Sequence, residues 1–317
     1  MGNGEILLRE ALLAADQVPE VETELIRLQD LEIKPCTGCI ACVKNIVKGG
    51  VGHCPQKDDF AFFEEKFYEC DAILISTPVY IMTPSGNFRV LCDRIGPSHD
   101  AAFAEYAKAM SGGNNKSDQR LFKHRIAGFI SVGGAPVNNW TSMGLPLMNL
   151  FTIPMNVQVL DQMQVLRAGE SGQVLFQDTA IRRAAKLGQN IALALSLPAE
   201  QQKWMGDEQG TCPVCHSGLM VVGKSAQIEC AICGIKGTIK LSGESLEVTF
   251  SPEEQAKSRL TMAGKRIHVQ EIGQVTGEFF AVKDQIPAKI EKYRSYRVKL
   301  SRPNKESTAC AECEIAE

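Results

Sequence analysis

The stretch AILISTPVY, residues 72–80, is an apolar and β-branched run that predicts a strand buried on both faces of a sheet. A helix is expected on each side of it, at Asp58–Tyr68 and at Pro84–Ile95. A second buried strand, IAGFISV at residues 126–132, repeats the pattern. Because strands that alternate with helices indicate βαβ units, the sequence predicts an α/β fold with a parallel sheet.

Further elements extend this alternation in both directions. Apolar spacing predicts helices at Glu5–Ala15, Ala101–Met110, Met143–Phe151 and Thr179–Leu197, and strands at Val21–Leu28 and Met155–Leu166. Pro198 ends the last helix. Residues 1–198 are therefore expected to form one open α/β domain, in which ligands bind at the carboxyl ends of the strands.

Two loops stand at those carboxyl ends. Thr77–Tyr80 offers backbone N–H groups and an aromatic face to a flat ligand. Gly133 and Gly134 end the next strand, where the absence of side chains lets the backbone approach a ring system closely. Taken alone, each loop is equally compatible with a plain turn, so neither decides for a ligand by itself.

The stretch KPCTGCIACVKNIVKGGVGHCPQKDD, residues 34–59, carries a compact cysteine motif. Cys36, Cys39 and Cys42 stand at C-x2-C-x2-C, and Cys54 follows after eleven intervening residues. Three thiolates that curl around one centre, with a fourth from further along, favour a [4Fe-4S] cluster. Zinc, which favours two separated C-x2-C pairs, and a disulfide knot are the alternatives.

Composition bounds the class of protein. The chain of 317 residues is 44% hydrophobic and 22% charged, and its net charge of −3 gives no electrostatic case for binding nucleic acid. No apolar run reaches the roughly 18 to 20 residues of a membrane span, and the N-terminus has no secretory apolar region, so a cytoplasmic protein without a membrane partner is expected. Twelve cysteines then indicate metal and redox chemistry rather than disulfides.

Several motifs follow one another in a recognisable order, namely GN at residues 2–3, an apolar helix, IKPCTGCIAC, KDD, STPVY, SGNFRVLCDR and SVGG. In this order they resemble the flavodoxin-like NADPH-dependent FMN reductases, and within that family the iron–sulfur flavoproteins. The resemblance covers residues 2 to about 197. It implies a flavodoxin-like, doubly wound parallel sheet.

The resemblance also implies two redox cofactors, FMN and a [4Fe-4S] cluster. FMN would be bound by Gly2, Asn3, Thr77, Pro78, Val79, Tyr80, Gly133 and Gly134. The cluster would be bound by Cys36, Cys39, Cys42 and Cys54. A homodimer or tetramer would place cluster and flavin close together across subunits, with Arg89, Asp93 and Arg94 near that interface or, alternatively, on a solvated helix face.

The chain departs from the family pattern in two places. The family opens with an apolar strand and a phosphate-binding loop, whereas this sequence starts at the last residues of that loop, with Gly4 where threonine is usual. A sheet without its first strand leaves unpaired backbone groups, so the chain is expected either to be shortened at its start or to fill the gap with another segment. The interval from Cys42 to Cys54 is also longer than the commonest family spacing.

A second cysteine group follows a polar linker at residues 199–209. Cys212 and Cys215 form one C-x2-C pair and Cys230 and Cys233 another, which predicts a zinc-ribbon-like β module at residues 210–250. Mononuclear iron uses the same four sulfurs, but the aromatic residues that shield such an iron are absent, so zinc is preferred. About forty residues bury too little core to fold alone, so the metal is expected to supply stability. His216 adjoins a complete ligand set and is expected to be exposed.

Residues 251–317 are read as a C-terminal extension and tail. Thr238–Phe250 alternates like a strand, Ser251–Arg259 reads as a capped helix, and Gly264–Val282 reads as further strand-like sequence. Cys310 and Cys313 form a C-x2-C pair that is interpreted as two incidental thiols rather than a redox or metal site.

These features together predict an oxidoreductase. FMN accepts electrons in pairs and releases them singly, and a [4Fe-4S] cluster carries one, so an iron–sulfur flavoprotein would pass electrons from ferredoxin or NAD(P)H to an acceptor. Two alternatives stay open. One is an NAD(P)H-dependent FMN, quinone or nitro-compound reductase, and the other is a non-catalytic metal-binding scaffold subunit of a redox complex.

Overall fold

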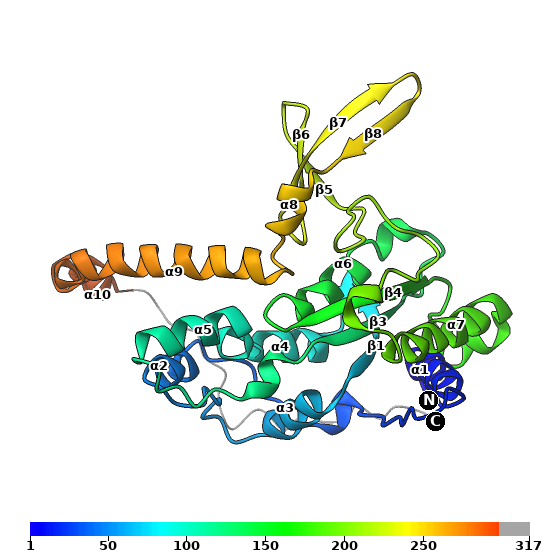
Figure 1. Cartoon of the computed structure of the whole chain (residues 1–317), viewed down its shortest axis with the longest axis horizontal. Helices are drawn as coiled ribbons and strands as arrows, with labels where there is room; N and C mark the ends of the chain where they lie inside the picture. Colours follow the sequence, from blue (N-terminus) through cyan, green and yellow to red (C-terminus); the bar gives the residue numbers. More distant parts are fainter. Residues whose placement is uncertain (298–317) are drawn as a thin grey trace. The chain divides into compact units, whose positions relative to one another are not determined.

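The computed structural model describes residues 1–297, in two compact units that divide after Val269. The first unit contains a mainly parallel sheet with its helices and a small antiparallel sheet (Figure 1). The predicted tail pair, Cys310 and Cys313, lies outside the described residues.

Helices and strands alternate along the first half of the chain as βαβ units require. They are α1 (Asn3–Ala15), α2 (Ala41–Val47), α3 (Phe60–Glu69), β1 (Ala72–Tyr80), β2 (Thr83–Pro84), α4 (Gly86–Arg94), α5 (Ala101–Met110), β3 (Arg125–Val132), α6 (Gly144–Met148), β4 (Val157–Val165) and α7 (Asp178–Leu195). The later elements are β5 (Met220–Val222), β6 (Gln227–Cys230), β7 (Lys236–Ser242), β8 (Ser245–Thr249), α8 (Pro252–Ala256), α9 (Met262–Val282) and α10 (Ile286–Ser295).

The larger sheet has the order β2-β1-β3-β4. β1, β3 and β4 run parallel, with Ala72 opposite Ile126 and Arg125 opposite Val157. β2 turns back on the end of β1 as a short antiparallel hairpin. The predicted α/β class with a parallel sheet is therefore confirmed, and β1 coincides with the predicted strand.

Side chains of β3 alternate between two cores, one on each face of the sheet. Ala127 and Phe129 point into a core shared with α3, α4 and α5, while Ile126 and Ile130 point into a core shared with α1 and α7. Helices thus cover both faces, which confirms the doubly wound arrangement. The pairing of β3 with β4 slips by one residue after Ala127, so that Asp161 faces α7.

Helices α1 and α7 lie side by side on their face of the sheet (Figure 1). Gly188 of α7 makes the close approach possible, because a Cβ atom there would lie 1.8 Å from the carbonyl oxygen of Ala11. Any larger residue at this position would push the two helices apart.

β1 forms an open edge of the sheet. Most of its residues are half-buried, whereas every residue of β3 is buried. The prediction of a strand at Val21–Leu28 is wrong, since that segment pairs with no neighbour and a strand needs one to accept its backbone hydrogen bonds. Within residues 1–297, only β2 pairs with this edge, so no described segment fills the expected gap.

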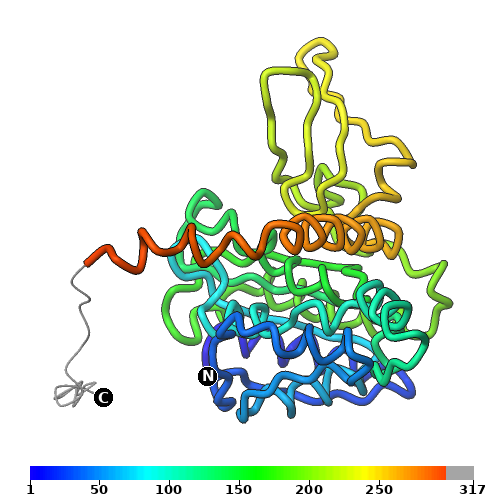
Figure 2. Tube along the Cα trace, turned by 90° about the vertical axis from the view of Figure 1, so that its left-hand side faces the viewer, coloured from blue at the N-terminus to red at the C-terminus, as the bar shows by residue number. Residues whose placement is uncertain are grey.

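The small sheet is antiparallel, with the order β5-β6-β7-β8 (Figure 1). Figure 2 shows the path of the chain through it in yellow-green and yellow. It confirms the predicted zinc-ribbon-like module. The expected single strand at Thr238–Phe250 is instead the β7–β8 hairpin, because the chain reverses between Ser242 and Ser245 through Gly243, whose φ is +64°.

Helix α9 contradicts the strand-like interpretation of Gly264–Val282. Apolar residues at Ile272, Val275 and Phe279 recur every three or four positions, which is helical spacing. Its first turns are tied to the larger sheet domain, since the buried Lys265 Nζ donates to the Met155 carbonyl at 2.7 Å. None of the helices in the described part of the chain is long and apolar enough to cross a membrane.

Candidate redox site and metal centre

The carboxyl ends of β1 and β3 expose aromatic side chains. Tyr80 ends β1 and is 65% exposed, and Trp140, in the loop after β3, is 60% exposed. Large rings are usually removed from water in a folded chain, and a ring left open offers a face for another flat molecule. Both rings stand where open α/β sheets bind their ligands.

Thr77 faces the interior and fixes the carboxyl end of β1 in place. Its hydroxyl is buried, donates to Ser85 Oγ at 3.1 Å and accepts from the Ser85 backbone N–H at 3.2 Å. These bonds hold the end of β1 against the start of α4. Pro78 and Val79 are half-buried between Thr77 and the exposed Tyr80.

Gly133 and Gly134 pack closely against other residues of the chain. A Cβ atom on Gly133 would lie 2.3 Å from Thr141 Cγ2, and one on Gly134 would lie 2.9 Å from Gly169 Cα. The two glycines thus let the loops after β3 and β4 pack closely. The sequence interpretation that they approach a flavin stays a prediction.

Gly2 and Asn3, the two predicted ligand residues at the N-terminus of α1, have different roles in the structure. Asn3 is buried, donates to the carbonyls of Ala168 and Glu170 at 3.0 and 2.7 Å, and accepts from the Val174 N–H. Its side chain therefore holds the loop after β4. Gly2 is exposed with open space where a Cβ would stand, so the first N–H groups of the helix can be approached by an anion.

These features fit FMN. The helix N-terminus suits a phosphate, and the rings of Tyr80 and Trp140 suit a flat ring system. The hydroxyl of Ser76 is buried beneath Gly4 and has no hydrogen-bond partner among the described residues, which marks a polar group beside the first turn of α1 that the chain alone does not satisfy.

The first cysteine group lies on irregular backbone at the surface. Cys36 and Cys39 are exposed, while Cys42 on α2 and Cys54 are half-buried. Ile40, between the second and third cysteines, has a φ of +51°, a conformation that β-branched residues rarely adopt. Hydrogen bonds from the Ala41 N–H and from Thr37 lower the pKa of Cys39.

A buried ion pair closes the ends of this cysteine loop. The side chains of Asp58 and Arg94 are 0% and 1% exposed and form a two-pronged pair, with Arg94 Nη2 donating to Asp58 Oδ1 at 3.1 Å. Arg94 also donates to the Lys34 carbonyl, and the Lys34 N–H donates to Asp58 at 2.9 Å. Residues just before Cys36 and just after Cys54 are thereby held together.

This pair corrects the sequence interpretation of Arg94. The alternative of a solvated face is wrong for Arg94, because its guanidinium lies buried over the Phe60 ring at 4.5 Å, whereas its place near a subunit interface stays a prediction. Arg89 and Asp93 do form an exposed pair on the same helix. Burial opposes the charge on Asp58, yet hydrogen bonds from Arg94 and from the Lys34 and Phe60 N–H groups lower its pKa.

A second buried carboxylate, that of Glu64, contacts the residue that precedes Cys54 in the chain. Glu64 accepts from His99 at 2.8 Å and pairs with His53 Nδ1 at 2.8 Å. His53, the neighbour of Cys54, was considered as a donor to a cluster sulfur, but in this structure its ring nitrogen faces Glu64. Burial works against ionisation of Glu64, and its hydrogen bonds with both histidines lower its pKa nonetheless.

The second cysteine group is built from two matching knuckles. In the first, the Cys212 N–H donates to Ser217 and the His216 N–H donates to Cys212. In the second, the Cys230 N–H donates to Ile235 and the Gly234 N–H donates to Cys230. Both turns need a left-handed residue after the second cysteine, and His216 and Gly234 supply it with φ of +57° and +77°.

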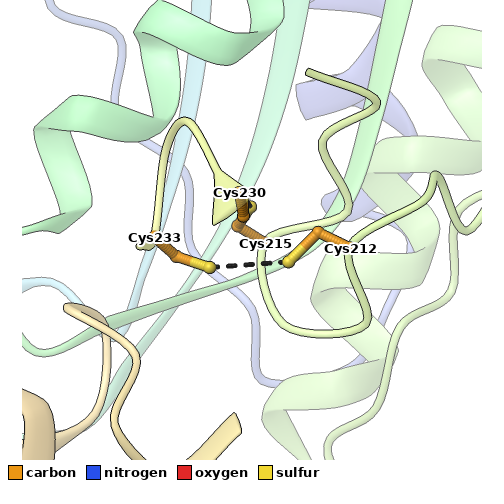
Figure 3. Close-up of side chains that lie close together, drawn as sticks. All are labelled: Cys212, Cys215, Cys230 and Cys233. Carbon is orange, nitrogen blue, oxygen red and sulfur yellow. Dashed lines mark hydrogen bonds between the residues drawn. The ribbon is translucent and has the colours of Figure 1, made fainter. Parts of the chain in front are cut away.

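The knuckles bring four buried sulfurs together (Figure 3). Cys212 and Cys233, and likewise Cys215 and Cys230, have sulfurs 3.4 Å apart. A tetrahedral ion with metal–sulfur bonds of about 2.3 Å needs sulfurs about 3.8 Å apart, so the set fits one ion with little movement. Hydrogen bonds among the four thiols lower the pKa of Cys212 and Cys230 and raise the pKa of Cys215 and Cys233, so the four groups titrate as one set.

Within the described chain, these four form the one group of possible ligands whose atoms all lie within 4.8 Å of one another. Cys36, Cys39, Cys42 and Cys54 are not gathered in this way. The 4.8 Å limit applies to a site for a single ion. A four-iron cluster holds its thiolates further apart than one ion does, so the limit does not test the predicted cluster.

The linker fastens the cysteine module to the larger sheet. Trp204 stacks on His216 with ring centroids 3.8 Å apart, and Gln162 on β4 donates to the His216 carbonyl at 3.2 Å. The expectation that His216 is exposed is therefore wrong, since it is half-buried. Burial lowers its pKa.

Sequence reasoning missed Arg94, Asp58, Glu64 and Trp204 as residues that hold the two cysteine groups in place. The KDD and CDR motifs contain Asp58 and Arg94, but nothing in the spacing pairs residues so far apart in the chain. A charged residue within an apolar helical pattern, such as Glu64 among phenylalanines, is the one available signal of a buried partner.

A protein family and several known proteins are similar to this chain. The family model described as NADPH-dependent FMN reductase matches residues 1–168. Flavone synthase cfoJ of Aspergillus candidus is 30% identical over 282 residues, which is 86% of this chain and 85% of that protein. A solved structure described as flavone reductase has a TM-score of 0.77 at 26% identity and covers 96% of each chain. Iron–sulfur flavoprotein MJ1083 of Methanocaldococcus jannaschii is 27% identical over 202 residues, which is 62% of this chain and 92% of that protein.

Proposed function

Because this chain belongs to the NADPH-dependent FMN reductase family and is an FMN-dependent oxidoreductase, we propose that it reduces flat conjugated ketones of the flavone class with NAD(P)H. The observation that carries this proposal is the extent of the similarity. The flavone synthase and flavone reductase match 86% and 96% of the chain, far beyond the 168 residues of the family model.

The carboxyl edge of the sheet supports a flat substrate. Tyr80 and Trp140 present exposed rings there. Bound FMN supplies hydride uptake from a nicotinamide and hydride delivery to a substrate. The chain's part is to hold the two flat molecules face to face, with Thr77 and Ser85 fixing the end of β1 that carries Tyr80.

The four-cysteine module is proposed to hold zinc. Its thiols are buried and already arranged for a tetrahedral ion, as structural zinc requires. A full ligand set leaves no open position for a substrate, so the ion's role is to fold the module and hold it against β4 through His216 and Gln162.

Steady-state kinetics tests the substrate. FMN-loaded protein under anaerobic conditions should oxidise more NADPH than its bound FMN can accept only when flavone is added, and mass spectrometry should find a product two hydrogens heavier than flavone. Turnover of NADPH with added free FMN or a quinone, but not with flavone, would contradict the proposal and favour a plain FMN or quinone reductase.

Electron transfer through a [4Fe-4S] cluster is the second candidate, favoured by the C-x2-C-x2-C loop and by the similarity to iron–sulfur flavoproteins. Cys36, Cys39, Cys42 and Cys54 would hold the cluster on a loop whose ends are fixed by Arg94 and Asp58. Ferredoxin or NAD(P)H would donate the electrons, in a homodimer or tetramer.

Anaerobic purification separates the two candidates. An iron–sulfur protein should contain about four iron and four sulfide per chain, with a broad visible absorption that dithionite bleaches. Protein that holds one zinc, no sulfide and full flavone reductase activity would exclude the carrier function. Light scattering of the same sample gives the number of subunits.

A further inference from the structure

The hairpin between β1 and β2 has an unusual tip. Val79 pairs with Pro84 and Tyr80 with Thr83, which leaves Ile81 and Met82 as a two-residue turn. Their φ angles are +47° and +70°, so both adopt the left-handed conformation that a type I′ turn requires. Natural type I′ turns favour asparagine followed by glycine, because these residues tolerate positive φ.

Isoleucine is a poor choice for such a turn. Its branched Cβ clashes with the backbone at positive φ, and strain of this kind persists where it serves a function. Ile81 is also 94% exposed, so no packing within the described chain offsets the strain, and Met82 is 37% exposed. A sequence chosen only to make this turn would have neither residue here.

The tip lies at the substrate edge of the sheet. It follows Tyr80 directly, and β2 packs against α6. Gly144, which begins α6, sits against Val79, since a Cβ there would lie 2.9 Å from Val79 Cγ2. The loop that precedes α6 carries Trp140, so the apolar tip borders the same edge as both exposed rings.

We infer that Ile81 and Met82 form an apolar substrate-binding element, which covers the outer face of a flat aromatic substrate while the flavin covers the other. The inference rests on the proposed function and adds to it the residues that select an apolar ring system. Contact with the substrate removes Ile81 from water. The strained turn directs the side chains of Ile81 and Met82 toward the substrate.

The test is the double variant Ile81→Asn/Met82→Gly, which suits a type I′ turn but removes both apolar side chains. FMN-loaded protein is titrated with flavone by fluorescence, and its melting temperature is measured. The melting temperature should rise by a few degrees. The Kd for flavone should rise about tenfold or more, while the Kd for FMN changes less than twofold.

Two further variants identify the cause. Ile81→Leu keeps an apolar side chain and should bind flavone within about threefold of the original protein. Glu20 is another exposed residue with a positive φ, 63°, and it lies well before the turn in the sequence. Glu20→Gly removes the backbone strain there and should leave flavone binding unchanged.

Unchanged flavone binding by the double variant overturns the inference, and so does original protein that binds no flavone. An equal loss of FMN binding also overturns it, because the turn would then serve the cofactor. If the original protein binds flavone but does not reduce it, the proposed function fails, while the change in Kd still decides the role of the turn.

Discussion

The two groups of four cysteines differ in what holds them. In the module at Cys212–Cys233, each pair is fixed by hydrogen bonds of its own knuckle, and all four sulfurs are buried. In the loop at Cys36–Cys54, two sulfurs are exposed, and order comes from the distant pair Arg94 and Asp58 at the loop ends. The comparison teaches that a short cysteine spacing builds a metal site locally only when each turn closes its own hydrogen bonds.

Loss of one module cysteine should have the largest effect. Cys233→Ser removes one of four ligands, and structural zinc supplies about 10 to 16 kcal/mol of folding free energy, so the module should lose its ion and its fold. Elemental analysis should find less than 0.2 zinc per chain. Trp204, one of two tryptophans, should change its fluorescence because it stacks on His216 next to Cys215.

Cys39→Ser is the matched control, since it alters an exposed thiol of the other group. It should leave zinc content and Trp204 fluorescence unchanged in a Trp140→Phe background. Retention of a full equivalent of zinc by Cys233→Ser would show that three ligands suffice and would remove the contrast between the two groups.

Removal of the loop-end cation should have the next largest effect. Arg94→Met leaves the Asp58 carboxylate buried without its partner, and breaking a buried pair in this way costs about 3 to 5 kcal/mol. Chemical denaturation should show this loss. Arg89→Met, which breaks the exposed pair with Asp93 on the same helix, should cost less than about 1 kcal/mol.

The same pair predicts a smaller, pH-dependent effect. The pKa of Asp58 is lowered in the folded state, so its contribution to stability is present above the unfolded pKa, near 4, and is lost as pH falls below that value. In Arg94→Met, burial without the cation raises this pKa, so a proton relieves the buried charge. The difference in free energy of unfolding between the original protein and Arg94→Met should therefore become smaller from pH 7 to pH 5. A difference that stays constant would contradict the pairing of Asp58 with Arg94.

Thiol reactivity should show the smallest effect. Cys39 is exposed with a lowered pKa, so more of it is thiolate at pH 7 than of an ordinary thiol. Mass-spectrometric mapping after brief iodoacetamide treatment of cluster-free protein should find Cys39 modified several-fold faster than any module cysteine. Equal labelling of both groups would mean that the module opens readily.

Local patterns in the sequence predicted much of the fold. The apolar runs at 72–80 and 126–132 became β1 and β3, and the four module cysteines met as their spacing indicated. These predictions succeed because a strand buried on both faces and a C-x2-C knuckle are each specified by neighbouring residues. The resemblance to the FMN reductases was confirmed by the family model, which depends on the same motifs.

Tertiary structure decided the rest. Val21–Leu28 has a strand's alternation but no partner, and Gly264–Val282 became a helix although it reads as strand-like. Arg94 became the clamp of the cysteine loop only because Asp58 and Lys34 lie against it in the folded chain. Strand pairing and buried ion pairs join residues far apart in sequence. They stabilise the protein only once folding has brought those residues into contact. The sequence alone therefore determined which local units form, and the packed fold determined which of them are paired, buried or exposed.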